Sequence, residues 1–238
     1  MVPITAPHRR PICCSVEHSE SVENYLKALY QLAGEGDTLT TSGISARLGV
    51  SAPSVSAMVA RLTEADLIGR DGGGRLALTD HGLRHAQAVV RRHRLLETFL
   101  FTALAVPWEE VHDEAEVLEH ALSERLTDRI AAALGDPRYD PHGDPIPPKD
   151  GEHVECWPEP LSSVAPGARF RVERISDRDS EALRYLGELG IRPGVVLVVT
   201  QRDPFGGPLW VTVDGKSLAL GDQLVGKVHG TVEERAQR

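Results

Sequence analysis

The spacing at which apolar residues recur along the chain changes across a segment rich in Pro, Gly and Asp, and this change limits the possible folds. Before this segment, apolar residues recur at helical spacing and are interrupted by Gly34, Gly49 and Pro107. Residues 136–160 (DPRYDPHGDPIPPKDGEHVECWPEP) predict an extended linker with little regular structure. The stretches beyond it predict strands. The sequence therefore indicates a helical part followed by a β-rich part.

Three short helices and a hairpin are expected in the first third of the chain. Ser21 is the expected cap of the first helix, and the second helix covers TTSGISARLG. The third helix follows Ser51, a favoured N-cap residue, with Pro53 in its first turn, where proline is tolerated. Two β-prone stretches flank DGGG and predict the hairpin. This order of elements describes a winged helix-turn-helix, which is a DNA-binding fold.

The third helix is the candidate recognition helix, because small side chains at its start would let it enter a major groove about 12 Å wide. The candidate DNA contacts are Ser51, Pro53, Ser54, Ser56 and Ala57 from this helix, with Arg47, Arg61 and Arg75 for phosphates. The alternative is an ordinary helical hairpin whose serines only cap. The net charge of −9 favours conditional over constitutive DNA binding, since phosphate contacts need basic residues.

Two longer helices are expected next, from Thr79 to about Leu104 and from about Glu109 or Asp113 to Leu134. The β-rich part contains five strand-like stretches and one inserted helix, DSEALRYLGELG. The strand-like stretches are ARFRVERI, VVLVVTQR, LWVTV, KSLAL and LVGKVHG. They predict a small β-barrel of about 70 residues. The expected fold class is therefore mainly α with α+β parts.

The motif HDEAEVLEH, residues 112–120, is the candidate metal-binding segment. At about 100° per residue, positions 112, 116, 119 and 120 share one helix face. In the preceding helix, His93 and Glu97 are four residues apart and also share a face. Glu116 has histidines rather than Lys or Arg at i−4 and i+4, so its charge is not balanced as on a solvated helix. Carboxylates and imidazoles without a thiolate favour Mn²⁺, and Fe²⁺, Co²⁺ or Zn²⁺ could bind in vitro.

Several classes of protein are disfavoured by what the sequence lacks. No apolar run approaches the length of about 20 residues that spans a bilayer, and no apolar core follows the basic N-terminal residues. The three cysteines (Cys13, Cys14 and Cys156) make neither a disulfide framework nor a CxxC site. We therefore expect a cytoplasmic protein without a membrane partner. It contains no HExxH or GxSxG motif, so an enzyme with a small organic substrate is not expected.

Over nearly its whole length after the tail, the chain resembles the diphtheria toxin repressor family of metal-dependent transcriptional regulators. The most specific segments are RRHRLLETFL (91–100) and VHDEAEVLEH (111–120), and the linker contains HGDPIP. The resemblance implies a homodimer that binds double-stranded operator DNA when metal is bound and controls metal-homeostasis genes. It also implies five regions along the chain. These are a tail (1–20), a winged helix-turn-helix domain (21–84), a helical metal-binding and dimerisation domain (85–140), a Pro-rich linker (141–160) and an SH3-like domain (161–232).

The resemblance also implies two sets of metal ligands. One set comprises Asn24, Glu116, Glu119 and His120, and the other comprises His93, Glu97 and His112. The C-terminal domain can add a ligand to the second set, for which Asp177 is the candidate, with Asp179 behind it.

Glutamate rather than cysteine at position 116 indicates the manganese-responsive branch of the family. Two positions depart from the pattern of that branch. Asn24 stands where aspartate is expected, and Lys27 stands where some manganese sensors have an acidic residue. The alternatives are an iron-dependent regulator of the same family and a winged-helix repressor that senses an organic ligand. A metalloenzyme is a further, disfavoured reading.

Overall fold

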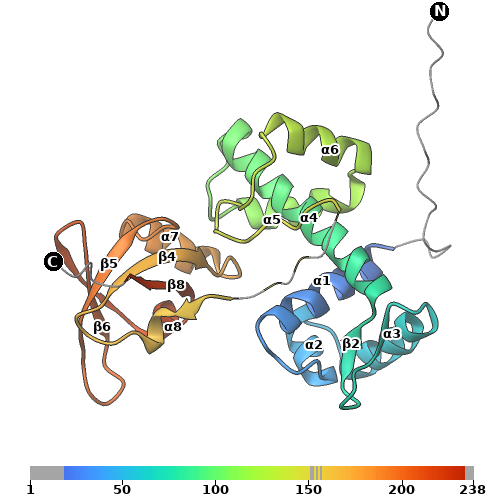
Figure 1. Ribbon diagram of the computed structural model, residues 1–238, viewed down its shortest axis with the longest axis horizontal. Coiled ribbons are helices and arrows are strands. Elements are labelled where there is room, and N and C mark those ends of the chain that lie inside the picture. The colour runs from blue at the N-terminus through green and yellow to red at the C-terminus, as the bar shows by residue number, and fades with distance from the viewer. Residues whose placement is uncertain (1–18, 151–152, 154, 156, 234–238) are drawn as a thin grey trace, which may run out of the picture.

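The computed structural model describes residues 19–150, 153, 155 and 157–233. A helical part and a β-rich part lie side by side, and the linker runs between them (Figure 1). The predicted order of helices, linker and strands is therefore confirmed. In the described residues, no helix is both long and apolar enough to cross a bilayer.

The winged helix-turn-helix contains three helices and a two-stranded antiparallel hairpin. The elements are α1 (Glu20–Gly34), α2 (Thr41–Leu48), α3 (Ala52–Glu64), β1 (Ile68–Arg70) and β2 (Leu76–Leu78). The predicted cap at Ser51 is confirmed, because its side chain accepts a hydrogen bond from the amide of Ser54. The prediction that Ser21 caps α1 is wrong, since α1 begins at Glu20 and Ser19 holds the N-cap position. Val22, Leu26, Ile44, Val55 and Leu62 form the centre of the core of this part.

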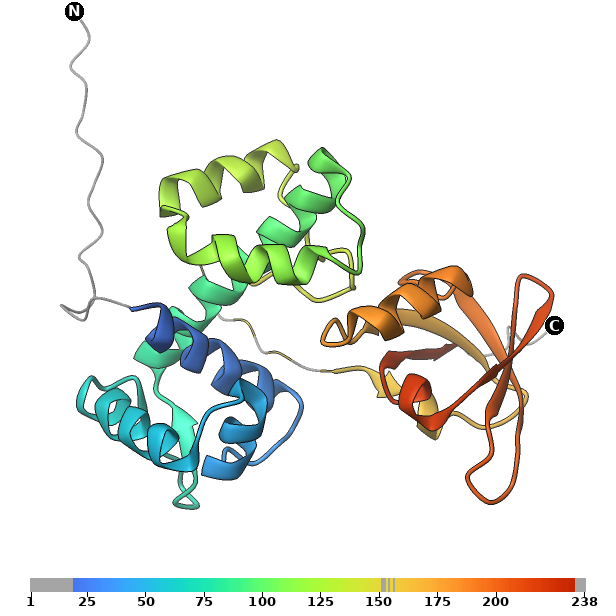
Figure 2. The ribbon, with the colours of Figure 1, turned by 180° about the vertical axis from the view of Figure 1, so that it is seen from behind.

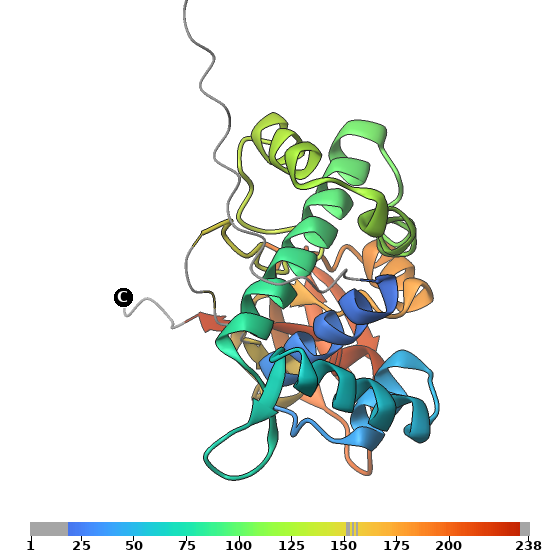
Figure 3. The same cartoon turned by 90° about the vertical axis from the view of Figure 1, so that its right-hand side faces the viewer.

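The long helix α4 (Asp80–Leu104) joins the hairpin to the rest of the helical part, as Figure 3 shows. Its N-cap Thr79 accepts a hydrogen bond from Gly82 and donates one to the carbonyl of Asp66. The start of α4 is thereby tied to the turn that precedes the hairpin. Because α1 also packs along α4, this helix holds the DNA-binding module in place.

The single helix predicted to run up to Leu134 is wrong. The structure has three pieces there: α5 (Val111–Leu118), the short 3₁₀ helix η1 (Glu119–Ala121) and α6 (Glu124–Ala133). Leu122 is extended, and Ser123 starts α6 by accepting a hydrogen bond from the amide of Leu126. The capping bond offers this backbone an alternative to continuing the helix. The α-helix therefore ends inside the HDEAEVLEH motif, whose last two residues, Glu119 and His120, lie in η1.

The β-rich part is a six-stranded antiparallel sheet in the order β3-β8-β4-β5-β6-β7. Its strands are β3 (Glu159–Pro160), β4 (Arg169–Ile175), β5 (Val196–Arg202), β6 (Leu209–Val213), β7 (Lys216–Leu220) and β8 (Val228–Glu233). The other elements are η2 (Leu161–Ser163), α7 (Ser180–Glu188) and α8 (Asp222–Val225). The helix α8 replaces the start of the predicted strand LVGKVHG, so β8 begins later than expected. The core consists mainly of alternating strand residues, including Phe170, Val172, Leu197, Val199 and Val211.

Candidate metal centre

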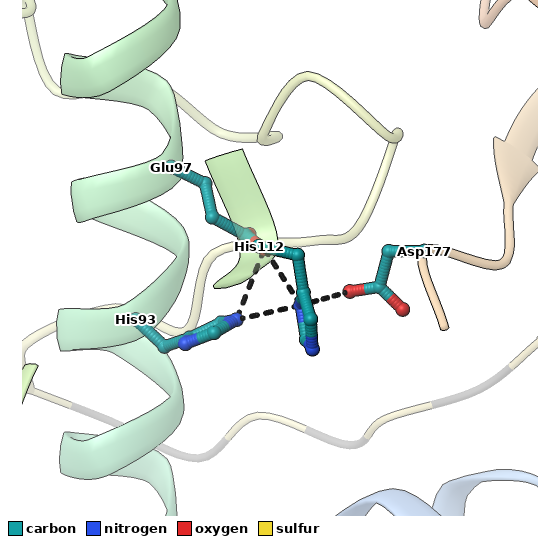
Figure 4. A group of neighbouring side chains, drawn as sticks. All are labelled: His93, Glu97, His112 and Asp177. Atoms are coloured by element: carbon teal, nitrogen blue, oxygen red, sulfur yellow. Dashed lines mark hydrogen bonds and ion pairs between the residues drawn. The ribbon is translucent and has the colours of Figure 1, made fainter. Parts of the chain in front are cut away.

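Four predicted ligands from three parts of the fold meet at one point (Figure 4). His93 and Glu97 come from α4, His112 comes from α5, and Asp177 comes from the loop between β4 and α7. The ring nitrogens of His93 and His112 lie 3.0 and 3.1 Å from Glu97 Oε1, and His112 Nδ1 lies 3.0 Å from Asp177 Oδ2. Two ligands that bind one ion at about 2.1 Å lie about 3.0–3.4 Å apart at octahedral or tetrahedral angles. We call this group, His93, Glu97, His112 and Asp177, the first cluster.

Burial and charge oppose each other in the first cluster. Burial by itself would lower the pKa of His112, but the Asp177 and Glu97 carboxylates outweigh it and raise that pKa to about 11. Burial likewise lowers the pKa of His93, and Glu97 and Glu119 overcome this and raise it to about 9. Burial would raise the pKa of the Asp177 carboxyl, but His112 lowers it overall. The carboxylates therefore favour positive charge at the point where they converge.

Glu116 and Glu119 form a second cluster, in which His93 also takes part. His93 Nδ1 lies 2.6 Å from Glu119 Oε2, while its other ring nitrogen faces the first cluster. The ammonium of Lys27, from α1, lies 2.6 Å from an oxygen of each glutamate. Burial by itself would lower the pKa of Lys27, but Glu119 and Glu116 raise it overall. Lys27 therefore stays charged and links α1 to the second cluster.

Within the expected set of Asn24, Glu116, Glu119 and His120, the two glutamates share one group of potential ligands, and His120 Nε2 lies 3.5 Å from Glu119 Oε1. The other ring nitrogen of His120, Nδ1, lies 2.6 Å from Glu23 Oε2. Asn24 Oδ1 and His120 Nε2 are both buried and have no hydrogen-bond partner among the described residues. Buried polar atoms in proteins nearly always have a partner. His120 Nε2, which lacks such a partner and lies 3.5 Å from Glu119 Oε1, fits a site that a metal ion completes.

A third group of potential ligands, Glu97, Asp140 and His142, was missed by the sequence analysis. All three residues are buried. His142 Nε2 donates a hydrogen bond to the carbonyl of Trp108, and its other ring nitrogen, Nδ1, lies 4.0 Å from Glu97 Oε1. Glu97 Oε2, Asp140 Oδ2 and His142 Nδ1 have no hydrogen-bond partner among the described residues. Burial and the charges of Asp144 and Glu97 raise the pKa of Asp140 well above its usual value.

Asp140 and His142 were missed because they lie in YDPHGD, inside the segment read as a linker. An irregular segment has no period from which a shared face can be deduced, so the only available signal was a carboxylate and an imidazole two residues apart. The turn around them packs tightly against β4, where the amide of Ile175 donates to the carbonyl of His142. The linker thereby delivers ligands to Glu97 as well as joining the two parts.

Gly143 is expected to be indispensable for this turn. Its φ is +87°, and a Cβ at this position would lie 1.9 Å from the carbonyl oxygen of Glu173. We predict that Gly143→Ala lowers the free energy of unfolding by about 2–4 kcal/mol, because positive φ and a backbone clash are both penalised. Urea unfolding measures this loss. Gly135→Ala is the matched control: Gly135 has a φ of +74°, but a Cβ added there would meet nothing within 4 Å. A control that loses as much would show that the clash contributes nothing.

The candidate DNA contacts of α3 lie on one exposed surface. Ser51, Pro53, Ser54, Ser56, Ala57 and Arg61 are all exposed, while Val55 and Leu62 of the same helix are buried. Figures 1 and 2 show α3 and the β1–β2 hairpin at the end of the molecule that lies away from the six-stranded sheet. Ser51 and Ser56 also make hydrogen bonds within the helix, as the alternative reading expected. The exposed surface is compatible with entry into a groove.

The arginines proposed for phosphate contact are not equivalent. Arg75 lies in the hairpin with its side chain 66% exposed, and it forms an ion pair with Asp71. Arg47 does not lie with the α3 residues on the open surface. Its side chain is 12% exposed and pairs with Glu35 at 2.6 Å, and Arg178 from the β-rich part pairs with the same carboxylate. The structure therefore gives Arg47 a contact that would compete with phosphate binding.

Three family models match consecutive parts of the chain. Residues 17–71 match the N-terminal DNA-binding domain of iron-dependent repressors, and residues 79–148 match their metal-binding and dimerisation domain. Residues 159–231 match the FeoA domain. The three matches follow the division of the structure into winged helix-turn-helix, helical part and β-rich part.

Relatives of known function cover most of the chain. The iron-dependent repressor IdeR of Mycobacterium tuberculosis is 41% identical over 86% of this chain and 94% of its own length. The diphtheria toxin repressor of Corynebacterium diphtheriae is 30% identical over 86% of this chain and 94% of its own length.

Solved structures agree with these relatives. A manganese-dependent transcriptional repressor in complex with manganese has a TM-score of 0.83 and 41% identity, and the match covers 89% of this chain and 99% of that one. The manganese regulator SloR has a TM-score of 0.74 and 31% identity, with 89% and 98% covered. These families consist of DNA-binding regulators and not of enzymes. The chain therefore belongs to the diphtheria toxin repressor family, and it is a metal-dependent, DNA-binding transcriptional repressor.

Proposed function

We propose that this repressor is activated by manganese and binds a pseudo-palindromic operator as a homodimer. The observation that carries the proposal is the convergence of His93, Glu97, His112 and Asp177 from α4, α5 and the β-rich part. The proposal keeps the five regions expected from the sequence. It also keeps a cytoplasmic location and a role in controlling metal-homeostasis genes.

The donor atoms support manganese. The candidate ligands are carboxylates and imidazoles, and no thiolate or thioether takes part in the groups of potential ligands found among the described residues. Hard oxygen donors suit Mn²⁺, and imidazole adds affinity for later transition metals. Two of the similar solved structures are manganese-dependent regulators. Of the two relatives, IdeR is described as iron-dependent, and the name of the diphtheria toxin repressor gives no metal. Iron is therefore the competing metal in the test below.

The mechanism follows from which elements supply the ligands. A bound divalent metal would supply positive charge that carboxylates and imidazoles from separate elements can share. In the first cluster, Asp177 ties the β-rich part to α4 and α5. In the second cluster, Glu116 and Glu119 face α1, the first helix of the DNA-binding module. If α1 and α4 become ordered, α3 becomes ordered with them. Metal then favours the arrangement that binds DNA to the extent that the metal binds this arrangement more tightly than the arrangement that does not bind DNA.

An exposed apolar surface on the helical part supports the homodimer. Large apolar side chains are exposed at the end of α4, on α5 and on α6, namely Phe101, Leu104, Val117, Leu118 and Leu126. Contact between two copies through these side chains would remove them from water. Two α3 helices could enter successive major grooves if the dimer held them about 34 Å apart.

The proposal is tested by measuring DNA binding with and without metal. DNA is first selected from a random-sequence pool with manganese-loaded protein, and its affinity is then measured by fluorescence anisotropy with Mn²⁺, Fe²⁺, Zn²⁺ or a chelator. We expect Mn²⁺ to strengthen binding by at least about 100-fold, which corresponds to about 3 kcal/mol of coupling. Equal affinity with metal and with chelator would contradict the metal switch. A sensor of an organic ligand would show no stoichiometric metal uptake in calorimetry.

Replacing Glu116 with cysteine is expected to shift the metal response from manganese towards iron or cobalt. Glu116 is the carboxylate of the second cluster closest to solvent, and a thiolate is a softer ligand that favours later transition metals. The measurement is the metal concentration that gives half-maximal DNA binding for Mn²⁺, Fe²⁺ and Co²⁺. The substitution Glu114→Cys, at an exposed position of the same helix outside the clusters, is the control. An unchanged metal profile in Glu116→Cys would argue against a ligand role for this residue.

A further inference from the structure

The side chain of Lys27 reaches from α1 into the second cluster and ends between its two carboxylates. Its ammonium nitrogen lies 2.6 Å from Glu116 Oε1 and 2.6 Å from Glu119 Oε1, and only 7% of the side chain is exposed. Lysine is rarely buried unless it is paired. A unit positive charge therefore occupies the position where these two oxygens would hold a metal ion.

The glutamate oxygens nearby have further partners, while Asn24 Oδ1 and His120 Nε2 have no hydrogen-bond partner among the described residues. Glu119 Oε2 lies 2.6 Å from His93 Nδ1, so both oxygens of this buried carboxylate already have partners. Glu116 Oε1, which contacts Lys27, also lies 3.5 Å from His112 Nε2. A divalent ion that takes one oxygen from each glutamate would lie within a few ångströms of the ammonium. Like charges at that distance repel strongly where water is excluded. The ion and the ammonium cannot share the site.

We propose that Lys27 is an internal competitor of the metal at Glu116 and Glu119. It neutralises the two carboxylates in the metal-free protein and has to be withdrawn before a divalent ion can bind both of them. Lys27 thereby sets the metal concentration at which the second cluster fills. This inference rests on the proposed metal-sensing function and assigns Lys27 a part in its threshold.

Two consequences follow from the position of Lys27. Among the described residues, the first cluster has no lysine or arginine contact of this kind, so it should fill at a lower metal concentration than the second. Moreover, Lys27 already joins α1 to Glu116 and Glu119 through ion pairs. Metal binding at the second cluster would therefore replace the ion pairs of Lys27 with metal–ligand bonds. The contact between α1 and this cluster exists before metal binds.

The test compares Mn²⁺ binding to the full-length wild type and to Lys27→Leu by calorimetry and equilibrium dialysis. We expect the weaker binding event of the wild type to tighten by about tenfold to a hundredfold in Lys27→Leu, or a second event to become measurable, since charged hydrogen bonds no longer have to be broken. The tighter event should change by less than the weaker one, because the ion pairs of Lys27 are with Glu116 and Glu119, although the two clusters share His93. Lys27→Arg keeps the charge and should show no gain. Lys149→Leu removes a lysine from an exposed ion pair with Asp128 and is the matched control.

A double variant locates the effect. In Lys27→Leu/Glu116→Gln, one of the two carboxylates is removed, and the gain in affinity should disappear. The thermal midpoint gives a second readout. Metal-free Lys27→Leu should unfold at a lower temperature than the wild type, because two buried carboxylates face each other without a cation. Mn²⁺ should raise its midpoint by more than that of the wild type. If Lys27→Leu does not fold without metal, Lys27→Gln, which keeps a hydrogen-bond donor, takes its place.

The outcomes separate the two proposals. A purely structural ion pair predicts the same loss of stability with and without Mn²⁺ and no gain in affinity, and this result would overturn the role of Lys27 while leaving the metal switch intact. A gain that is equal in Lys27→Arg would also overturn it. A wild type that binds no Mn²⁺ at all would overturn the proposed function itself.

Discussion

Replacing Glu97 with glutamine is expected to abolish metal-dependent DNA binding. Glu97 is fully buried, and its Oε1 lies 3.0 Å from His93 and 3.1 Å from His112. It belongs both to the first cluster and to the group with Asp140 and His142. Loss of a residue that merely supports a ligand costs about 10–100-fold in metal affinity, so we expect a loss of more than about 100-fold here. Calorimetry with Mn²⁺ and anisotropy with selected DNA measure the two effects.

Glu114→Gln is the matched control for this prediction. Glu114 lies in the same acidic motif, but it is exposed and belongs to none of the three groups. The control should bind Mn²⁺ and DNA like the wild type. Wild-type metal affinity in Glu97→Gln would show that the cluster is a structural network of ion pairs, which was the alternative reading of these histidines and glutamates.

Arg94→Ala is expected to cause the largest loss of stability among single substitutions in the helical part. The guanidinium of Arg94 is buried, makes two hydrogen bonds of 2.8 and 2.9 Å to Glu155, and lies 3.1 Å from Asp144 Oδ1. Arg174 of β4 pairs with the same two carboxylates and stacks on Trp157. Without Arg94, Arg174 would have to balance both buried carboxylates, and removing one partner of a buried ion pair costs about 3–5 kcal/mol. Urea unfolding measures the loss.

Two further variants show the cause of that loss. Arg84→Ala, at an exposed position of the same helix, should change the free energy of unfolding by less than about 0.5 kcal/mol. The double variant Arg94→Met/Glu155→Leu removes both charges and should be less destabilised than Arg94→Ala. A double variant that is more destabilised would mean that packing, rather than the uncompensated charge, causes the loss. Because Arg94 joins α4 to the linker, the loss should also loosen the turn that carries Asp140 and His142.

The elements that depend on local interactions were predicted well. The cap at Ser51, the hairpin around DGGG and the long helix that follows Thr79 agree with the structure, because hydrogen bonds within a few residues determine them. The errors lie where two local preferences compete. After Leu118 the apolar period continued, but the chain turns into the 3₁₀ helix η1 and then into a new helix that Ser123 caps. In LVGKVHG, the residues before the glycine form the end of α8 instead of a strand.

Residue spacing alone was enough to predict a winged helix-turn-helix, a helical part and a β-rich part, and to place His112, Glu116, Glu119 and His120 in one motif. Helical spacing is enough for that, since it places residues three and four apart on the same face. Tertiary structure alone decided which side chains from distant segments meet there. Asp177 reaches His112, the linker turn brings Asp140 and His142 to Glu97, and Lys27 lies between two of the expected ligands. Such encounters depend on how whole elements pack, and no local period encodes them.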